Sequence, residues 1–311
     1  DPDAQLVMAG AIAAQNNPYD LRVPRMTTTV GMEFRSMMYR WIEQHTKEIF
    51  RSQSVAPAVV LYSERNRDYL DTLYIGGKVV SDSPPMRDRQ WLGMKGGTPQ
   101  ELEYIGDYRG LSMFMYQHQI PTDIYPFSRV DKKLLSHYKV IVLPYMMTLT
   151  ESEKAILLFA VEQGDTLIVS GSEPGTRDEK GRILETGLWD EFMENAIDEP
   201  VIKSVGTGRI VFWNKQIGRD YLKRHDNTIS NTLMPLMADT GVIPWTREKD
   251  RLVVQPYVYK NKMVIHVLNY SWVGALKNQP NRLSLELSVP WNSGKKIQQI
   301  TQSEPQFDGD V

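Results

Sequence analysis

Ser172 and Glu173 are the residues of this chain whose position best suits a chemical role. They follow the apolar run at 165–170, which has the pattern of a buried strand, and they lie in a loop bounded by glycines at 171–175. In open α/β sheets, ligands bind in the crevice outside the carboxyl ends of the strands. The loops after two other predicted strands supply the remaining candidates for the rim of such a crevice, which are Tyr62, Glu64, Arg65 and Tyr145.

A retaining glycosidase needs two carboxyl groups about 5 Å apart, one as acid/base and one as nucleophile. Nothing in the sequence nominates such a pair. Glu64 and Asp68 have helical spacing, but the neighbouring Arg65 and Arg67 favour ordinary ion pairing at the surface. Glu173 is the best single carboxylate, although a turn residue is its simpler interpretation.

Metal, disulfide and phosphate chemistry find no support in the residue pattern. The chain has no cysteine, and its five histidines are scattered rather than clustered as metal ligands are. The glycines at 171 and 175 match neither nucleotide-binding fingerprint, so we expect no cofactor. Exposed tryptophans can stack on sugar rings. Trp91 and Trp272, which lie in predicted loops, are therefore candidates for carbohydrate contact, although most tryptophans anchor a core.

The elements that would position these residues centre on a strand–helix–strand unit. Apolar runs at 139–143 and 165–170 flank a segment with helical spacing at 151–163. Thr150 followed by Glu153 predicts a capping box at the start of that helix, and Gly164 predicts its left-handed C-cap. Such a unit has a parallel strand pair at its centre.

The same alternation continues on both sides of this unit. We expect strands at 58–62, 122–125, 139–143, 165–170 and 209–213. We expect helices at 34–50, 98–118, 131–137, 151–163, 184–196 and 221–237. The order predicts an α/β fold with a doubly wound parallel sheet of flavodoxin type.

The C-terminal part is β in character. A hairpin is expected at 252–259 and 263–270, an alternating strand at 283–289 and a last strand at 297–300. Together they predict a small antiparallel β-sandwich. The expected organisation is an N-terminal helical lead-in at 1–54, an α/β domain at 55–205, and a bridging helix with the sandwich at 206–311.

Composition narrows the function classes. The 311 residues include 36 basic and 38 acidic side chains, so the near-neutral charge argues against nucleic acid or an anionic membrane as partner. No apolar run is long enough to span a membrane. The absence of cysteine fits an exported protein slightly better than a cytosolic one, and it does not fix the compartment. Because the chain begins at Asp1 rather than methionine, we expect a processed protein or a piece of a longer one.

Three segments carry a resemblance to a known family. They are YRGLSMFMYQHQIPTDIYP at 108–126, the strand–helix–strand unit at 139–175, and VIHVLNYS at 264–271. Together they resemble the part of a family 42 type β-galactosidase that follows its catalytic barrel. That part is a domain similar to class I glutamine amidotransferases, often called the trimerisation domain, followed by a small β-sandwich. The resemblance implies that the helix at 34–50 corresponds to the last barrel helix, that the assembly is a trimer, and that the catalytic carboxylates precede Asp1.

The amidotransferase resemblance also provides a reference for Ser172. Those enzymes hold a nucleophilic cysteine on an elbow of the form glycine, any residue, cysteine, any residue, glycine. Ser172 stands at the cysteine position, while Ser170 and Pro174 replace the two glycines. A serine nucleophile also needs a base, and no histidine has the His-x-Glu spacing of the amidotransferase triad. A degenerate elbow is the favoured interpretation.

The expected function is therefore non-catalytic. The chain would build the oligomer and support the carbohydrate site of a β-galactosidase-like glycoside hydrolase, with further copies of itself as partners and carbohydrate as a candidate ligand. Two alternatives stay open. One is a stand-alone carbohydrate-binding or assembly protein, and the other is a diverged serine hydrolase of amidotransferase-like fold that uses Ser172.

Overall fold

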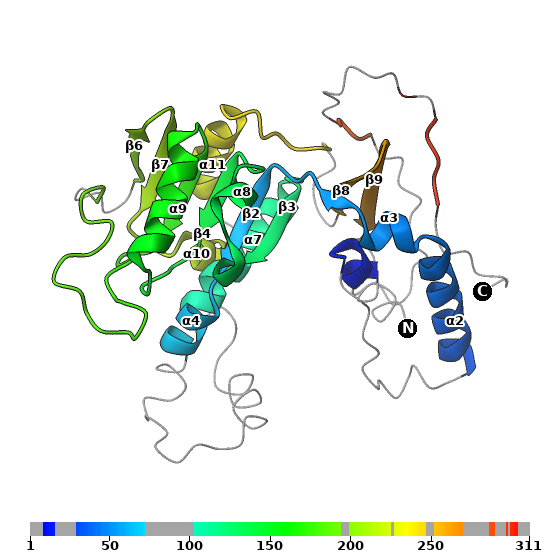
Figure 1. Ribbon diagram of the computed structural model, residues 1–311, viewed down its shortest axis with the longest axis horizontal. Coiled ribbons are helices and arrows are strands. Elements are labelled where there is room, and N and C mark those ends of the chain that lie inside the picture. Colours follow the sequence, from blue (N-terminus) through cyan, green and yellow to red (C-terminus); the bar gives the residue numbers. More distant parts are fainter. Residues whose placement is uncertain are drawn as a thin grey trace, which may run out of the picture. The chain divides into compact units, whose positions relative to one another are not determined.

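The chain folds into two compact units (Figure 1). The computed structural model describes residues 9–15, 29–71, 103–193, 199–224, 227–246 and 252–269, together with short stretches at 286–289, 297 and 299–303. One unit is Ala56–Ile243, and the other combines Asp1–Val55 with Pro244–Val311.

The Ala56–Ile243 unit is built on a six-stranded sheet in the order β3-β2-β4-β5-β7-β6. Its parallel strands are β2 (Ala58–Tyr62), β3 (Thr122–Pro126), β4 (Val140–Leu143), β5 (Thr166–Ser170) and β7 (Gly208–Trp213). The edge strand β6 (Val201–Val205) pairs antiparallel with β7. The central strands β4 and β5 are buried on both faces, which is why they are continuous apolar runs in the sequence.

Helices cover both faces of this sheet. The helices of the unit are α4 (Glu64–Asn66), α7 (Glu103–Gln117), α8 (Lys132–Leu135), α9 (Glu151–Glu162), α10 (Ile217–Arg224) and α11 (Asn227–Ala238), with a π-helical turn at Arg67–Asp71 and a 3-10 turn at Phe127–Arg129. Side chains of α8 and α9 join the core on one face, and those of α10 and α11 join the core on the other, while α7 contributes Tyr104 to the first core and Leu111, Phe114 and Met115 to the second. This is a mixed α/β fold with a mostly parallel sheet, as the sequence predicts.

Local signals in the sequence are confirmed where they are strong. Thr150 and Glu153 form the predicted capping box of α9, and Gly164 has a φ of +110° just after that helix. The expected helix at 221–237 is instead two helices, α10 and α11. β7, α10 and α11 follow the expected domain limit at 205 and pack within the Ala56–Ile243 unit.

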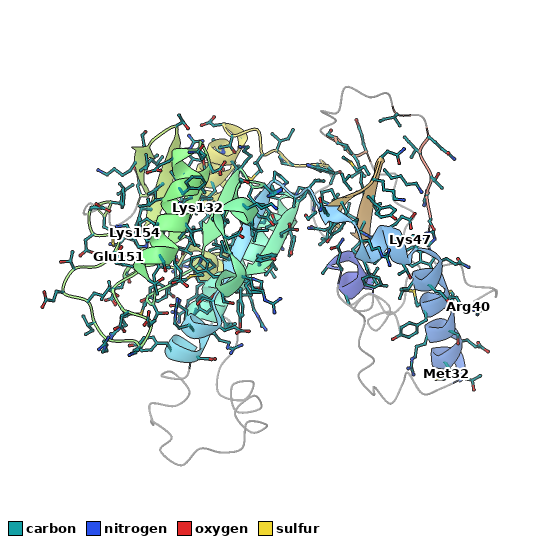
Figure 2. The ribbon with its side chains drawn as sticks, viewed as in Figure 1. Met32, Arg40, Lys47, Lys132, Glu151 and Lys154 are labelled. Carbon is teal, nitrogen blue, oxygen red and sulfur yellow. The ribbon has the colours of Figure 1, made fainter. Side chains whose placement is uncertain are left out.

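The predicted helix at 184–196 is wrong in its described part, because residues 184–193 form turns. Trp189 is fully buried there. Lys154 of α9, which is labelled in Figure 2, places its Nζ 5.8 Å from the ring centroid of Trp189 and 5.8 Å from that of Phe192. Lys154 Nζ also donates to Glu191 Oε1 at 2.7 Å. The segment thus folds over α9 through tertiary contacts that a helical apolar pattern does not reveal.

The second unit contains α2 (Thr29–Gln44), α3 (Thr46–Phe50) and a three-stranded antiparallel sheet in the order β1-β8-β9. β1 is Gln53–Ser54, and β8 (Leu252–Tyr259) and β9 (Lys262–Asn269) form the predicted hairpin around Lys260, whose φ is +56°. Ile12, Met38, Ile42 and Ile49 form a small core. The Figure 2 labels Met32 and Arg40 mark the solvent side of α2.

The expected β-sandwich strands are not found in the described residues. Of the expected strands at 283–289 and 297–300, the described residues are 286–289, 297, 299 and 300, and none of them belongs to a strand. The other positions, 283–285 and 298, lie outside the described part of the chain. In the described residues 286–289 the side-chain exposure does alternate, because Glu286 and Ser288 are exposed and Leu287 and Val289 are half-buried, but these residues pair with no strand. Within the described ranges, no helix has the length and apolarity needed to cross a membrane.

Candidate functional site

The carboxyl edge of the sheet, where a ligand crevice was expected, is filled by the chain's own loops. In the loop after β4, Tyr145, Met146 and Thr148 are 4%, 0% and 1% exposed. The segment after β5 runs beside this loop: the Gly175 amide donates to the Met146 carbonyl at 2.8 Å, and the Arg177 amide donates to the Met147 carbonyl at 3.0 Å. The two loops therefore satisfy each other's backbone groups, as strands do.

Asn66 joins a third loop to this arrangement. It is fully buried in α4, just after β2. Its Nδ2 donates to the Thr148 carbonyl at 2.9 Å, and its Oδ1 accepts from the Thr148 amide at 3.0 Å. Ser63 begins the same helix, because its hydroxyl accepts from the Asn66 amide at 3.2 Å. The side-chain amide thus substitutes for a backbone partner, and the loops after β2, β4 and β5 are held together.

The predicted rim residues at the end of β2 are engaged in contacts within the chain. Arg65 makes a two-pronged ion pair with Glu153, at 2.8 and 2.6 Å. Glu153 also accepts from the Thr150 amide at 2.9 Å, so the pair connects α4 with the start of α9. The hydroxyl of Tyr62 accepts from Arg67 Nη1 at 3.0 Å.

Aromatic packing fixes the Tyr62 ring as well. Its centroid lies 5.0 Å from that of Tyr108 and 6.0 Å from that of Tyr104, both on α7. Glu64, the other candidate at this strand end, is exposed on α4. Tyr62 and Arg65 are partly exposed.

Tyr145 is buried among the loops at the carboxyl ends of the strands rather than exposed on their surface. Its ring lies against Gly171, where an added Cβ would come 2.1 Å from Tyr145 Cδ2. Gly171 also has a φ of +117°, so both space and backbone conformation require glycine at this position. The loop after β5 can therefore turn directly over the loop after β4.

Ser172 and Glu173 are exposed at the tip of this turn. The Glu173 carbonyl accepts from Thr176 Oγ1 at 3.0 Å, which closes the turn. Among the described residues, no hydrogen bond joins a histidine or a carboxylate to Ser172, so nothing in that part of the chain activates the hydroxyl. Trp91 and Trp272 lie outside the described residues. Those residues also contain no group of three or more side chains that could hold a metal ion.

A buried carboxylate that the sequence analysis did not single out lies beneath the loops. Asp107 of α7 is fully buried. Its Oδ1 accepts from the Ser170 hydroxyl at 3.0 Å and from the amides of Gly218 at 2.8 Å and Arg219 at 3.4 Å, while its Oδ2 accepts from the Tyr145 amide at 2.8 Å. Burial raises the pKa of Asp107 to about 6, and the donors limit the rise because they favour the ionised form.

Asp107 therefore connects four elements at the carboxyl edge. Its carboxylate caps the N-terminus of α10, because the first amides of a helix have no acceptor within the helix and the positive end of the helix dipole favours an anion. Ser170 is the last residue of β5, and its hydroxyl also accepts from the Ile217 amide at 3.1 Å. A sequence signal was present: Asp107 stands among the apolar positions of an amphipathic helix, where an acidic residue needs buried partners.

The arrangement is that of a structural junction. Its backbone groups and the Asn66 and Asp107 side chains are directed at each other, although Arg65 Nε, Thr148 Oγ1 and Arg177 Nε are buried with no hydrogen-bond partner among the described residues. The exposed serine and carboxylate at the tip have no activating partner in that part of the chain. The paired groups hold the loops together.

Comparisons with known proteins place this fold. No protein family model matches the sequence, and no curated protein does either. Among solved structures, β-galactosidase from Bacillus circulans sp. alkalophilus is 18% identical, with a TM-score of 0.54, over 76% of this chain and 39% of that chain. A catalytic mutant of Gan42B, a GH42 β-galactosidase from G. stearothermophilus, is 13% identical, with a TM-score of 0.52, over 85% of this chain and 44% of that chain.

A third similar structure is the cold-adapted β-galactosidase from a Rahnella species. It is 11% identical, with a TM-score of 0.55, and the match covers 87% of this chain and 46% of that chain. At such identities the likeness shows the fold. The chain spans less than half the length of these three proteins and has the fold of a region of family 42 type β-galactosidases.

Proposed function

We propose that this chain is a non-catalytic region of a β-galactosidase-like glycoside hydrolase, where it builds the homo-oligomer and supports the carbohydrate site. The observation that carries the proposal is the filled carboxyl edge of its sheet. Loops 144–149 and 171–184 are hydrogen-bonded to each other where an α/β enzyme would hold its ligand. A glycosidase would also need two carboxyl groups about 5 Å apart, and the buried Asp107 is engaged with backbone amides.

The strand order supports the finer fold assignment. Numbered along the chain, the five parallel strands of the Ala56–Ile243 unit have the order 2-1-3-4-5, which is the flavodoxin-type order. We assign this unit to the amidotransferase-like domain on that basis. Residues 1–54 would then be the lead-in from a preceding barrel, which would carry the catalytic carboxylates of the whole enzyme.

The edges of the sheet support an assembly role. Ile202 on the edge strand β6 is 49% exposed, and Ile124 on the opposite edge strand β3 is 40% exposed. An edge strand with an exposed branched apolar side chain is a site at which another chain can pair or pack. A closed homo-oligomer, a trimer by resemblance, would cover such an edge.

Light scattering coupled to gel filtration tests this proposal. The purified chain, of 35.7 kDa, should elute as a discrete homo-oligomer, and Ile202→Asp should shift it toward the monomer. Ile183→Asp is the matched control, because Ile183 is 74% exposed in a loop away from the sheet edge. The same sample should not hydrolyse a nitrophenyl galactoside. A monomer at every concentration would contradict the assembly role, and turnover that survives purification would contradict the non-catalytic one.

A further inference from the structure

A corner at the end of β2 joins an aromatic ring to a guanidinium–carboxylate pair. Arg67 and Asp68 begin the π-helical turn that follows α4. Arg67 Nε donates to Asp68 Oδ1 at 2.8 Å, and Arg67 Nη2 lies 2.6 Å from the same oxygen. The remaining nitrogen, Nη1, donates to the Tyr62 hydroxyl at 3.0 Å. One arginine therefore holds a carboxylate and a phenol in fixed positions relative to each other.

Aromatic residues of α7 support this corner from the core. The ring centroids of Tyr62 and Tyr108 are 5.0 Å apart, and the two rings are tilted by 56°. Tyr104 is fully buried, and its centroid lies 6.0 Å from that of Tyr62. Tyr62 and Tyr108 are both partly exposed. A ligand can therefore reach two tyrosines whose positions are set before it binds, which lowers the entropic cost of binding.

The polar groups of the corner are accessible as well as ordered. The Arg67 and Asp68 side chains are 41% and 67% exposed. The contacts of Arg67 use three of the five N–H groups that a guanidinium carries, so the group can donate to a ligand while it keeps those contacts. The corner thus presents a donor, an acceptor and a ring that are held together by hydrogen bonds.

The charges at this corner are balanced in pairs. Arg67 is paired with Asp68, and Arg65 is paired with Glu153 at 2.6 Å. An anionic ligand such as phosphate would have to compete with these carboxylates for the guanidinium groups. A neutral ligand with several hydroxyl groups would not, because a hydroxyl can donate to a carboxylate and accept from a guanidinium.

We propose that Tyr62, Arg67 and Asp68 form a binding site for a neutral carbohydrate. The Tyr62 ring packs against the C–H face of a pyranose ring, Asp68 accepts from one sugar hydroxyl, and Arg67 donates to another. Because few groups take part, the dissociation constant should be on the order of 1 mM. The choice of a galactoside as the first ligand rests on the proposed function, whereas the site itself requires only a neutral sugar.

Saturation-transfer-difference NMR on the full chain tests this site. The probes are methyl β-galactoside, methyl β-glucoside and inorganic phosphate, each titrated under the same conditions. The galactoside should give a saturable signal that is strongest for the ring protons of one sugar face, since that face packs against the tyrosine. Phosphate, followed by its ³¹P line width, should not bind and should not displace the sugar.

Two variants and one control assign the signal to the corner. Tyr62→Ala removes the ring and Asp68→Asn removes the charged acceptor, and each should weaken sugar binding about tenfold. Because Asp68 is mostly exposed, its variant should fold even if Tyr62→Ala does not. Arg182→Gln is the matched control, because Arg182 pairs with Asp178 at 2.6 Å and has no aromatic ring among its described contacts. That variant should bind the sugar as the wild type does.

The outcomes separate this site from the assembly role. The absence of a saturable signal for both sugars, unchanged affinity in Asp68→Asn, or displacement of the sugar by phosphate would each overturn the proposal. Binding of the glucoside alone would support the site and contradict only its link to a galactosidase. Light scattering on the same samples should give the same oligomer mass for Asp68→Asn as for the wild type, so loss of sugar binding and loss of assembly are distinguishable.

Discussion

Replacing Gly110 with alanine should strongly destabilise the Ala56–Ile243 unit. α7 and α10 cross with their backbones in contact at this point. A Cβ on Gly110 would lie 1.7 Å from the Gly218 carbonyl oxygen, and a Cβ on Gly218 would lie 2.0 Å from the Asp107 carbonyl oxygen. Because these neighbours are backbone atoms, no side chain can rotate away, and the helices must separate.

The magnitude follows from the separation required. Non-bonded carbon and oxygen atoms approach to about 3.5 Å, so the Gly218 backbone must move by roughly 2 Å. Such a shift breaks the 2.8 Å hydrogen bond from the Gly218 amide to Asp107, which as a bond to a charged group contributes about 1.5–3 kcal/mol. Overpacking costs about 1–3 kcal/mol more. Alanine's higher helix propensity offsets about 1 kcal/mol, which leaves a net loss of about 1.5–5 kcal/mol.

Urea denaturation followed by tryptophan fluorescence measures this loss, because Trp189 and Trp213 are 0% and 2% exposed in the same unit. Gly241→Ala is the control, since Gly241 has a φ of +80° but nothing within 4 Å of an added Cβ. That variant should lose only about 1–2 kcal/mol, the cost of a left-handed backbone. Helix propensity alone predicts that Gly110→Ala is the more stable of the two. A Gly110→Ala protein as stable as the wild type would refute the close crossing.

Three further outcomes are expected. Asn66→Ala should lower the free energy of unfolding by about 2–4 kcal/mol in denaturant titrations, because the amide and the carbonyl of Thr148 both lose a buried partner. A loss of free energy no larger than that caused by replacing an exposed asparagine would contradict the loop junction. Burial lowers the pKa of His266 from 6.5 to about 4, so the unfolded chain binds the proton more tightly and the free energy of unfolding should fall as the pH drops from 6.5 to about 4. His266→Phe should remove about 1–3 kcal/mol of that pH-dependent change. Wild type and Ser172→Ala should both fail to react with a fluorophosphonate probe, and labelling that disappears in the variant would establish a serine hydrolase.

The sheet was predictable because its signals are local. Strands buried on both faces are continuous apolar runs, and the capping box of α9 spans only Thr150 to Glu153. β6 escaped prediction because it lies at an edge with one exposed side, so Lys203 and Ser204 interrupt its apolar pattern. The start of α10 at Ile217, four residues before the expected helix, was missed for another reason: the acceptors of its first amides are Asp107 and Ser170, which lie on other elements.

The candidate site shows the same division. Position at a strand end could be read from the sequence: Tyr62 is the last residue of β2, and Glu64 and Arg65 follow it. Their partners could not be read, because Arg65 pairs with Glu153, 88 residues away. Asp107 bonds to the amides of Tyr145 and Gly218, 38 and 111 residues away. Whether a loop residue faces a ligand or its own chain depends on such distant contacts.

The discontinuity of the second unit has a consequence for biosynthesis. Its N-terminal part needs β8, since Gln53 pairs with Val258 and the Tyr257 hydroxyl donates to the Ala13 carbonyl, 244 residues earlier, at 2.6 Å. The Ala56–Ile243 unit is continuous and can complete its sheet while the ribosome is still adding the residues that follow. The residues of this unit that precede Ala56 are thus translated well before β8, which they need as a partner. In the meantime the apolar stripe of α2 is uncovered, and a chaperone is the natural cover for it.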